Sequence, residues 1–170
     1  IITGETAKKQ NAEELVKALA HKAGKFVCAA AGPNFESVIS AMGSGAVAYS
    51  KKTGKTIMNI DIGGGTSNIA VIKNGDIVDV SCVNVGGRLL AFSPDNEIIR
   101  IEEPIKSLEK EVKTKFELGQ KIDDETKENI ARLLAKSLLE VILRKDSVSE
   151  LTEKLLVTRP LVFKEAIDEI

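Results

Sequence analysis

The feature that most limits how this chain can fold is a run of three glycines set between two apolar stretches. Residues 59–80 read NIDIGGGTSNIAVIKNGDIVDV, and Asn74-Gly75 separates the second apolar stretch from a third. Asn-Gly is the strongest short signal for a two-residue hairpin, because both residues tolerate the positive φ of a type I′ turn. The glycine run is therefore followed by a β-strand, and three antiparallel strands are predicted for this region.

The glycine run has to be compared with the known kinds of glycine-rich loop. A dinucleotide-binding turn needs the spacing G-x-G-x-x-G and leads into a helix, and a Walker A loop ends in Gly-Lys-Ser/Thr. Residues 61–68 read DIGGGTSN and continue into a strand, so neither motif fits. Two interpretations stay open, a glycine turn that serves only backbone geometry and a phosphate clamp on a β-hairpin.

In such a clamp, backbone and side chains share the binding of a polyphosphate. Gly63, Gly64 and Gly65 let the backbone approach the ligand and offer N–H donors, and Thr66 adds a hydroxyl donor. Asp61 would repel a phosphate unless a cation lies between them. Mg²⁺ is such a cation, because it keeps several waters and binds one or two carboxylates. The aspartate and the threonine therefore favour the clamp over a plain turn.

Apolar periodicity predicts the elements before and after the glycine run. Helical spacing predicts a helix over residues 11–24, an apolar run predicts a buried strand over 25–31, and Asn34 is the expected N-cap of a second helix that ends near Tyr49. This second helix is rich in alanine, glycine and serine, which predicts close packing against a sheet or another helix. Strands are expected at residues 56–61, 67–74 and 76–85.

The last third of the chain is predicted to be helical. Apolar residues at helical spacing predict one helix over residues 105–116, ended by Gly119, and another over 130–142 after an acidic cap region at Asp123-Asp124. A third helix is expected to begin at a cap formed by Ser147. Together with the strands, this order of elements predicts an α/β chain.

Composition excludes several classes of function. The chain has 24 Lys and Arg against 25 Asp and Glu, so it offers no basic surface for nucleic acid or an anionic membrane. Its apolar runs are too short to cross a bilayer. Cys28 and Cys82 lie in apolar, strand-like stretches without metal-ligand spacing, which indicates reduced thiols in a cytoplasmic protein.

The motif NIDIGGGTSNIAV resembles the second phosphate loop of the actin, Hsp70 and sugar-kinase superfamily of ATPases. A narrower resemblance covers residues 1–92. The motifs ITGE-A at residues 2–7, AGP-ESVI at 31–39, NIDIGGGT-N at 59–68 and NVGGRLL at 84–90 are similar to those of the ethanolamine ammonia-lyase reactivating factors of bacterial ethanolamine utilization. After Phe92, the likeness rests on helical character and spacing alone.

This resemblance implies a fold, a function and a set of ligands. The fold would be part of an actin-like (ribonuclease-H-like) ATPase, with a mixed sheet that carries the β-hairpin phosphate loop and with a C-terminal helical segment. The protein would use ATP and Mg²⁺ to release damaged cobalamin from adenosylcobalamin-dependent ethanolamine ammonia-lyase, in the cytoplasm or in a bacterial microcompartment.

The resemblance also assigns roles to individual residues. Asp61 would bind the metal, Gly63 to Thr66 the phosphates, and Gly86 and Gly87 would lie near the ribose or the phosphates. The Hsp70 form of the loop has an aspartate where Asn68 stands, so an acidic role in metal or water handling does not carry over to this position.

The same resemblance sets the expected domain organisation. Residues 1–54 would be the tail of the first actin-like lobe and residues 55–170 the opening part of the second, with the hairpin phosphate loop at 57–90 and the helical segment at 103–170. The first phosphate loop and the adenosine-binding loop of that fold have no counterpart here, and the opening IITGE reads as the end of a strand. We therefore expect a piece of a longer protein, and exposed strand edges of a truncated sheet favour self-association.

Three alternatives stay open beside reactivation. Within the superfamily, the protein would be a small-molecule kinase, which needs a catalytic base near the γ-phosphate, or a filament-forming cytoskeletal protein. Outside it, the chain would be a structural α/β domain that binds no nucleotide.

Overall fold

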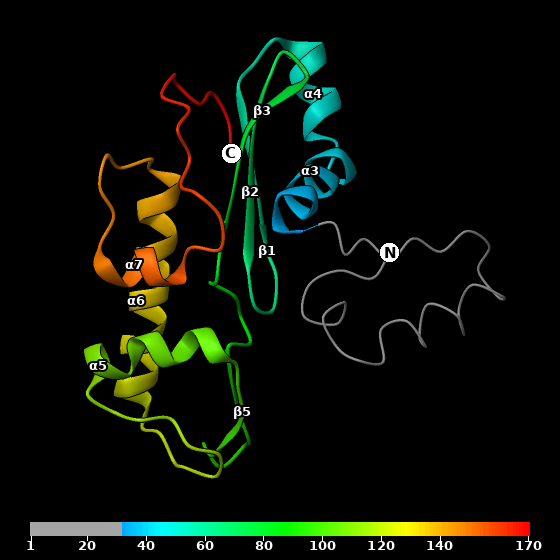
Figure 1. Cartoon of the computed structure of the whole chain (residues 1–170). Coiled ribbons are helices and arrows are strands. Elements are labelled where there is room, and N and C mark those ends of the chain that lie inside the picture. Colours follow the sequence, from blue (N-terminus) through cyan, green and yellow to red (C-terminus); the bar gives the residue numbers. More distant parts are fainter. Residues whose placement is uncertain (1–31) are drawn as a thin grey trace, which may run out of the picture.

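The computed structural model of the protein describes residues 32–170 (Figure 1). Its centre is a three-stranded antiparallel sheet in the order β1-β2-β3, formed by β1 (Ile57–Ile62), β2 (Ser67–Lys73) and β3 (Asp76–Val83). The hairpin turn is confirmed, with φ of 53° at Asn74 and 87° at Gly75. The predictions for the helix at 11–24, the strand at 25–31 and Cys28 lie outside the described residues.

One face of this sheet is covered by two short helices, α3 (Pro33–Gly43) and α4 (Ala46–Thr53). The single helix predicted from Asn34 to Tyr49 is wrong, because Gly45 adopts a left-handed conformation with φ of 86° and interrupts it. The predicted close packing of small residues is confirmed at Ala41, which is fully buried against the sheet. It is wrong for Gly43, which is exposed.

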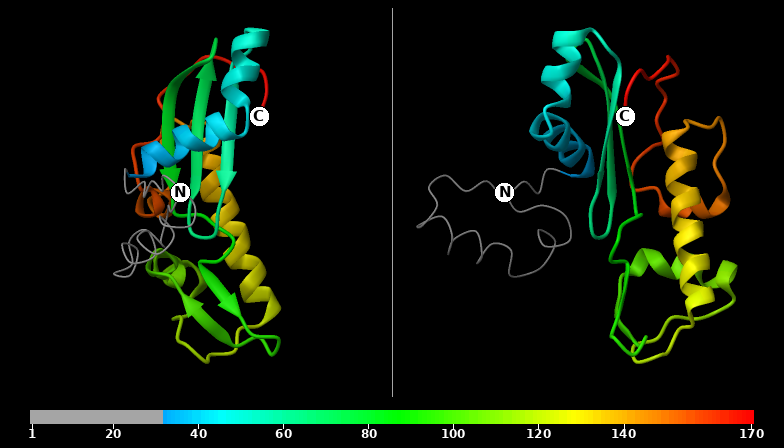
Figure 2. Two further views of the ribbon diagram at one scale, coloured as in Figure 1. Left: turned by 90° about the vertical axis from the view of Figure 1, so that its right-hand side faces the viewer. Right: turned by 180° about the vertical axis from the view of Figure 1, so that it is seen from behind.

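The other face packs against α6 (Asp124–Ile142) and α7 (Glu150–Leu155), so the sheet lies between two helical layers (Figure 2). Coverage on both faces explains why β2 reads as an unbroken apolar run, with residues 69–72 fully buried. The cap at Asp123 is confirmed, since its side chain accepts a hydrogen bond from the Thr126 N–H. The cap predicted at Ser147 is wrong, because Ser149 caps α7 instead.

Beyond β3 lies a smaller antiparallel pair that the sequence did not predict, β4 (Leu90–Phe92) and β5 (Ile98–Ile101). It is followed by a 3₁₀ helix, η1 (Glu103–Leu108), and one turn of α-helix, α5 (Glu109–Val112). The predicted helix over 105–116 therefore ends early, at Lys113, whose φ of 54° is left-handed. Gly119 lies in the loop that follows and ends no helix.

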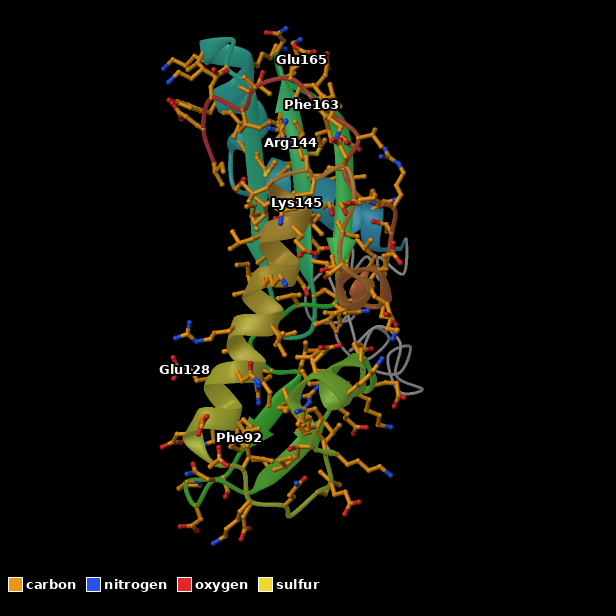
Figure 3. All side chains as sticks on the ribbon, turned by 90° about the vertical axis from the view of Figure 1, so that its left-hand side faces the viewer. Phe92, Glu128, Arg144, Lys145, Phe163 and Glu165 are labelled. Carbon is orange, nitrogen blue, oxygen red and sulfur yellow. The ribbon has the colours of Figure 1, made fainter. Side chains whose placement is uncertain are left out.

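The chain ends in an extended segment, residues 156–170, which we call the strap. It leaves α7, pairs with the outer edge of β3 through Val157 and reaches the outer edge of β1, where the Met58 N–H donates to the Glu169 carbonyl (Figure 1). Arg144, just after α6, donates to the carbonyls of Phe163 and Glu165 and so ties the strap to the end of this helix (Figure 3).

The described residues therefore form an α/β fold. The sheet differs from the mixed one that was predicted, because its named strands all pair antiparallel and the one parallel contact among residues 32–170 is the bridge between Ile57 and Glu169. Cys82 is buried in β3, as expected for a reduced core thiol. Every helix of the described part is too short or too polar to cross a membrane.

Candidate functional site

The glycine loop connects β1 to β2 at the end of the sheet that lies farthest from the Asn74-Gly75 turn (Figure 1). The Gly63 N–H donates to the Thr66 carbonyl at 2.8 Å and closes the loop on itself. Asp61 and Ile62, the last two residues of β1, are exposed, so the strand carries the loop out into solvent. The sequence prediction of a glycine loop between two antiparallel strands is confirmed.

A second glycine turn holds the loop in place. The Gly87 N–H donates to the Gly63 carbonyl at 3.0 Å, and the Arg88 N–H donates to the Gly64 carbonyl at 2.7 Å. Gly86 lies so close that a Cβ atom there would be 2.5 Å from the Gly64 carbonyl oxygen, which no real side chain tolerates. Gly86 and Gly87, which the resemblance places near the ribose or the phosphates, are thus in direct backbone contact with the glycine loop.

This docking turns two carbonyls of the loop toward the second turn and leaves N–H donors unused. The backbone N–H groups of Gly64, Gly65 and Thr66 donate no hydrogen bond within residues 32–170, and the Thr66 hydroxyl has no partner there either. Consecutive unpaired N–H groups in a turn form a concave donor surface that suits an anion. The loop therefore has the donor set that a phosphate clamp requires.

Asp61 lies at the entrance to this loop, opposite Asn68 in the β1-β2 pairing. Directly opposed residues of an antiparallel pair point to the same face, with Cβ atoms about 5 Å apart. The Asp61 side chain is exposed and makes no ion pair with residues 32–170, whereas Asn68 is 6% exposed and its Oδ1 is buried without a hydrogen-bond partner in the same part of the chain. An unsatisfied buried acceptor costs about 1–3 kcal/mol, so its retention here suits a site that receives a donor.

The oxygen ligands available at this position fit a hydrated magnesium ion better than a dehydrated metal. Among the described residues there is no group of three His, Cys, Asp or Glu side chains that would enclose a metal. Mg²⁺ keeps several waters and uses one or two carboxylates, and a bound water would also donate to Asn68 Oδ1. Asp61 and Asn68 therefore fit the group that the resemblance implies.

Arg88 is the residue of this site that the sequence reasoning missed. Its backbone N–H contacts the glycine loop, and its Cβ and Cδ atoms lie 3.8 and 3.9 Å from the position where a Gly64 Cβ would stand. The motif NVGGRLL contains the signal that could have identified it, because a cationic residue directly follows the pair Gly86-Gly87.

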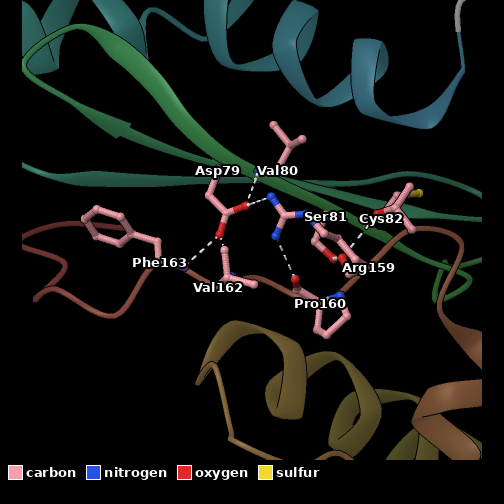
Figure 4. Close-up of polar contacts among 9 residues, drawn as sticks. Asp79, Val80, Ser81, Cys82, Arg159, Pro160, Val162 and Phe163 are labelled. Atoms are coloured by element: carbon pink, nitrogen blue, oxygen red, sulfur yellow. Dashed lines mark hydrogen bonds and ion pairs between the residues drawn. The ribbon is translucent and has the colours of Figure 1, made fainter.

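Two buried carboxylates lie elsewhere in the fold, and their contacts are structural. Asp79, on β3, is 3% exposed and accepts hydrogen bonds from the Arg159 guanidinium at 2.8 Å and from the N–H groups of Val162 and Phe163 at 2.6 and 2.8 Å (Figure 4). It fixes the strap to the sheet. All its oxygens are occupied, so no catalytic role is assigned to it.

Glu140, on α6, fixes α7 in place in the way that Asp79 fixes the strap. One carboxylate oxygen accepts from the Ser149 N–H and hydroxyl, each at 2.8 Å, and from the Thr152 hydroxyl at 2.7 Å. Burial raises the pKa of this carboxyl, but the hydrogen bonds from Ser149 and Thr152 outweigh it and lower the pKa from its ordinary 4.5 to about 2. The charged carboxylate of Glu140 therefore links α6 to α7 by hydrogen bonds.

A groove of about 490 Å³ opens between α3 and the outer edge of β3, near the Asn74-Gly75 turn. Apolar side chains such as Met42 and Val78 line it, and Arg159 lies at its rim. It is at the opposite end of the sheet from the glycine loop, so it is separate from the candidate site.

Comparison with known proteins places the chain in a family. The family model that matches residues 1–170 describes the ethanolamine utilisation protein EutA. The chain belongs to this family. The resemblance drawn from the glycine loop and its neighbouring motifs is thereby confirmed.

Two curated EutA relatives are similar to the chain, and both are named ethanolamine ammonia-lyase reactivase EutA. The relative from Salmonella typhimurium is 38% identical over 158 residues, which cover 93% of this chain and 33% of the relative. The relative from Escherichia coli is 46% identical over 104 residues, 61% of this chain and 22% of the relative. The chain thus spans a third or less of their length. No solved structure matches it, and the actin-like superfamily stays a prediction.

Proposed function

We propose that the full-length protein is an ATP-dependent reactivating chaperone for adenosylcobalamin-dependent ethanolamine ammonia-lyase, and that this chain supplies one phosphate loop of its nucleotide site. The family and the name of its relatives support the link to the lyase. The observation that carries the nucleotide part is the glycine loop, whose three N–H donors have no partner within residues 32–170, while a second glycine turn is hydrogen-bonded to its carbonyls.

Each residue of the loop has a distinct task in this proposal. The N–H groups of Gly64, Gly65 and Thr66 bind phosphate oxygens, as does the Thr66 hydroxyl, because hydrogen bonds to charged oxygens are the strong ones. Gly63 keeps the loop closed. Asp61 holds the hydrated Mg²⁺ that balances the phosphate charge.

ATP binding and hydrolysis supply the free energy for expelling a damaged cobalamin from the lyase. Nucleotide binding at this loop also has a direct route to the rest of the fold, since Gly63 and Gly64 are hydrogen-bonded to the turn that leads from β3 into β4. A partly actin-like architecture of the complete protein, with a second lobe opposite this loop, belongs to the same proposal. So does its location beside the lyase, in the cytoplasm or a microcompartment.

The test is recovery of activity by lyase that carries a damaged cobalamin. The full-length protein is added with ATP, Mg²⁺ and intact cofactor, and the controls omit ATP or Mg²⁺. Recovery is expected only in the complete mixture. Asp61→Asn should abolish most of it, whereas the matched variant Asp76→Asn, an exposed acid at the far end of the β2-β3 hairpin, should behave as wild type.

Two results would overturn the proposal. Recovery that is equal with and without ATP would remove the nucleotide from the function. Phosphorylation of an added alcohol or acid, with no recovery of the lyase, would identify a small-molecule kinase instead.

A further inference from the structure

Arg88 is placed at the glycine loop by two successive backbone hydrogen bonds. Its own N–H donates to the Gly64 carbonyl, and the preceding N–H, of Gly87, donates to the Gly63 carbonyl. The stem of the side chain then lies near Gly64, since its Cβ and Cδ atoms are 3.8 and 3.9 Å from the position that a Cβ added at Gly64 would take. The position of this arginine is therefore set by the loop itself.

The guanidinium of Arg88 has no partner within the chain that the structure describes. The other arginines of residues 32–170 all have one: Arg100 binds Glu102, Arg132 binds Glu128, Arg144 binds two carbonyls and Arg159 binds Asp79. Arg88 thus differs from them in carrying an exposed and unpaired charge, and it does so beside the unused N–H donors.

A cationic side chain at this position suits the charge of the site. The loop residues 63–66 carry no charged side chain, and the carboxylate of Asp61, on the strand that enters the loop, opposes the approach of a phosphate. Backbone N–H groups contribute only partial charges. A guanidinium contributes a full charge and a planar pair of donors that matches two phosphate oxygens.

We propose that Arg88 is a phosphate-binding residue of this site and that it contacts the polyphosphate chain of the bound nucleotide. The inference rests on the proposed nucleotide site and extends it by a side chain outside the glycine loop. Because the contact is to phosphate, Arg88 should contribute to the binding of ATP and of inorganic triphosphate, but not to the binding of adenosine.

The experiment measures binding of the full-length protein to ATP, to inorganic triphosphate and to adenosine, by isothermal calorimetry with Mg²⁺ present. Arg88→Ala should weaken ATP and triphosphate by about tenfold or more and leave adenosine unchanged. The affinities of Arg88→Lys for ATP and triphosphate should lie between those of the wild type and Arg88→Ala, since lysine keeps the charge but loses the paired donors. The control is Arg132→Ala, which removes an exposed arginine of α6 and should bind as wild type.

Salt adds a readout that a purely structural role would not change. The affinity of the wild type for triphosphate should fall more steeply with ionic strength than that of Arg88→Gln, because one phosphate–cation contact is absent in the variant. Free energies of unfolding in urea should be equal for both.

The outcomes separate this inference from the proposed function. If Arg88→Ala binds ATP within about twofold of the wild-type affinity, the role of Arg88 is overturned and the proposed nucleotide site still stands. ATP binding that depends on Arg88, in a protein that fails to reactivate the lyase, supports Arg88 and overturns the proposed chaperone activity. Wild-type protein that binds neither ATP nor triphosphate overturns both.

Discussion

Replacing Glu140 by glutamine tests how the two C-terminal helices are held together. The change keeps the shape of the side chain and removes the charge that accepts three hydrogen bonds from Ser149 and Thr152. Without that charge, α7 loses its attachment to α6, and with it the contact of the Leu155 carbonyl with the Asn84 N–H in the turn after β3.

The size of the effect follows from the pKa of Glu140. Folding lowers it from 4.5 to about 2, and each pKa unit corresponds to about 1.4 kcal/mol of preference for the charged form. The residue is 4% exposed, so solvent screens the interaction little. We expect the charge to stabilise the fold by about 3–4 kcal/mol at pH 7.

The pH dependence has a fixed sign. A carboxyl whose pKa is lower in the folded state stabilises that state at pH values above its unfolded pKa, and this contribution is lost as pH falls through the folded pKa. The stability difference between wild type and Glu140→Gln should therefore be complete above about pH 5, shrink below pH 4.5 and vanish near pH 2.

Urea unfolding followed by circular dichroism, at a series of pH values, measures this difference. Glu128→Gln is the matched control, because Glu128 lies on the exposed side of the same helix in a surface pair with Arg132 and should cost under about 1 kcal/mol (Figure 3). A difference for Glu140→Gln that is below about 1 kcal/mol at pH 7, or that does not change with pH, would refute the reasoning.

Three further predictions concern the loop and the strap. Gly86→Ala should destabilise the fold by about 1–3 kcal/mol in urea, because its Cβ would collide with the loop backbone, whereas Gly87→Ala meets no atom within 4 Å and should cost far less. Asp79→Ala should release the strap and expose residues 156–170 to limited proteolysis, while Arg159→Ala, which removes only a half-exposed partner, should not. Asp61→Asn should weaken ATP binding by the full-length protein in Mg²⁺ but change adenosine binding little.

The parts of the fold that the sequence predicted are those with a local signal. Asn74-Gly75 specifies its own turn, so the strands on either side could be assigned with their direction. Helix α6 is 19 residues long, carries the apolar stripe of residues 130–142 and has a side-chain cap at Asp123, so its existence and its start were both predictable.

The elements that were missed depend on contacts distant in sequence. β4 and β5 have three and four residues, too few for an alternating pattern to stand out. Asp79 meets Arg159 across 80 residues and Glu140 meets Thr152 from another helix, so neither buried acid could be recognised from its neighbours. Within the site, the glycine loop and Asp61 were predictable from their motif, whereas the motif NVGGRLL shows a cation at Arg88 but not its contact with the glycine loop, which depends on the packing of the second turn.

The strap has a consequence for how the protein acquires its structure. Thr56, beside the first strand of the sheet, is hydrogen-bonded to Asp168, 112 residues later in the chain. A contact between residues so far apart in the sequence forms late in folding, because closing the long loop between them costs conformational entropy before the contact adds stability. During synthesis, the β-hairpin leaves the ribosome long before the residues that cover the outer edge of β1. As far as residues 32–170 are concerned, that edge is therefore open to pairing with other chains until translation passes Glu169, and an open strand edge favours aggregation in this interval.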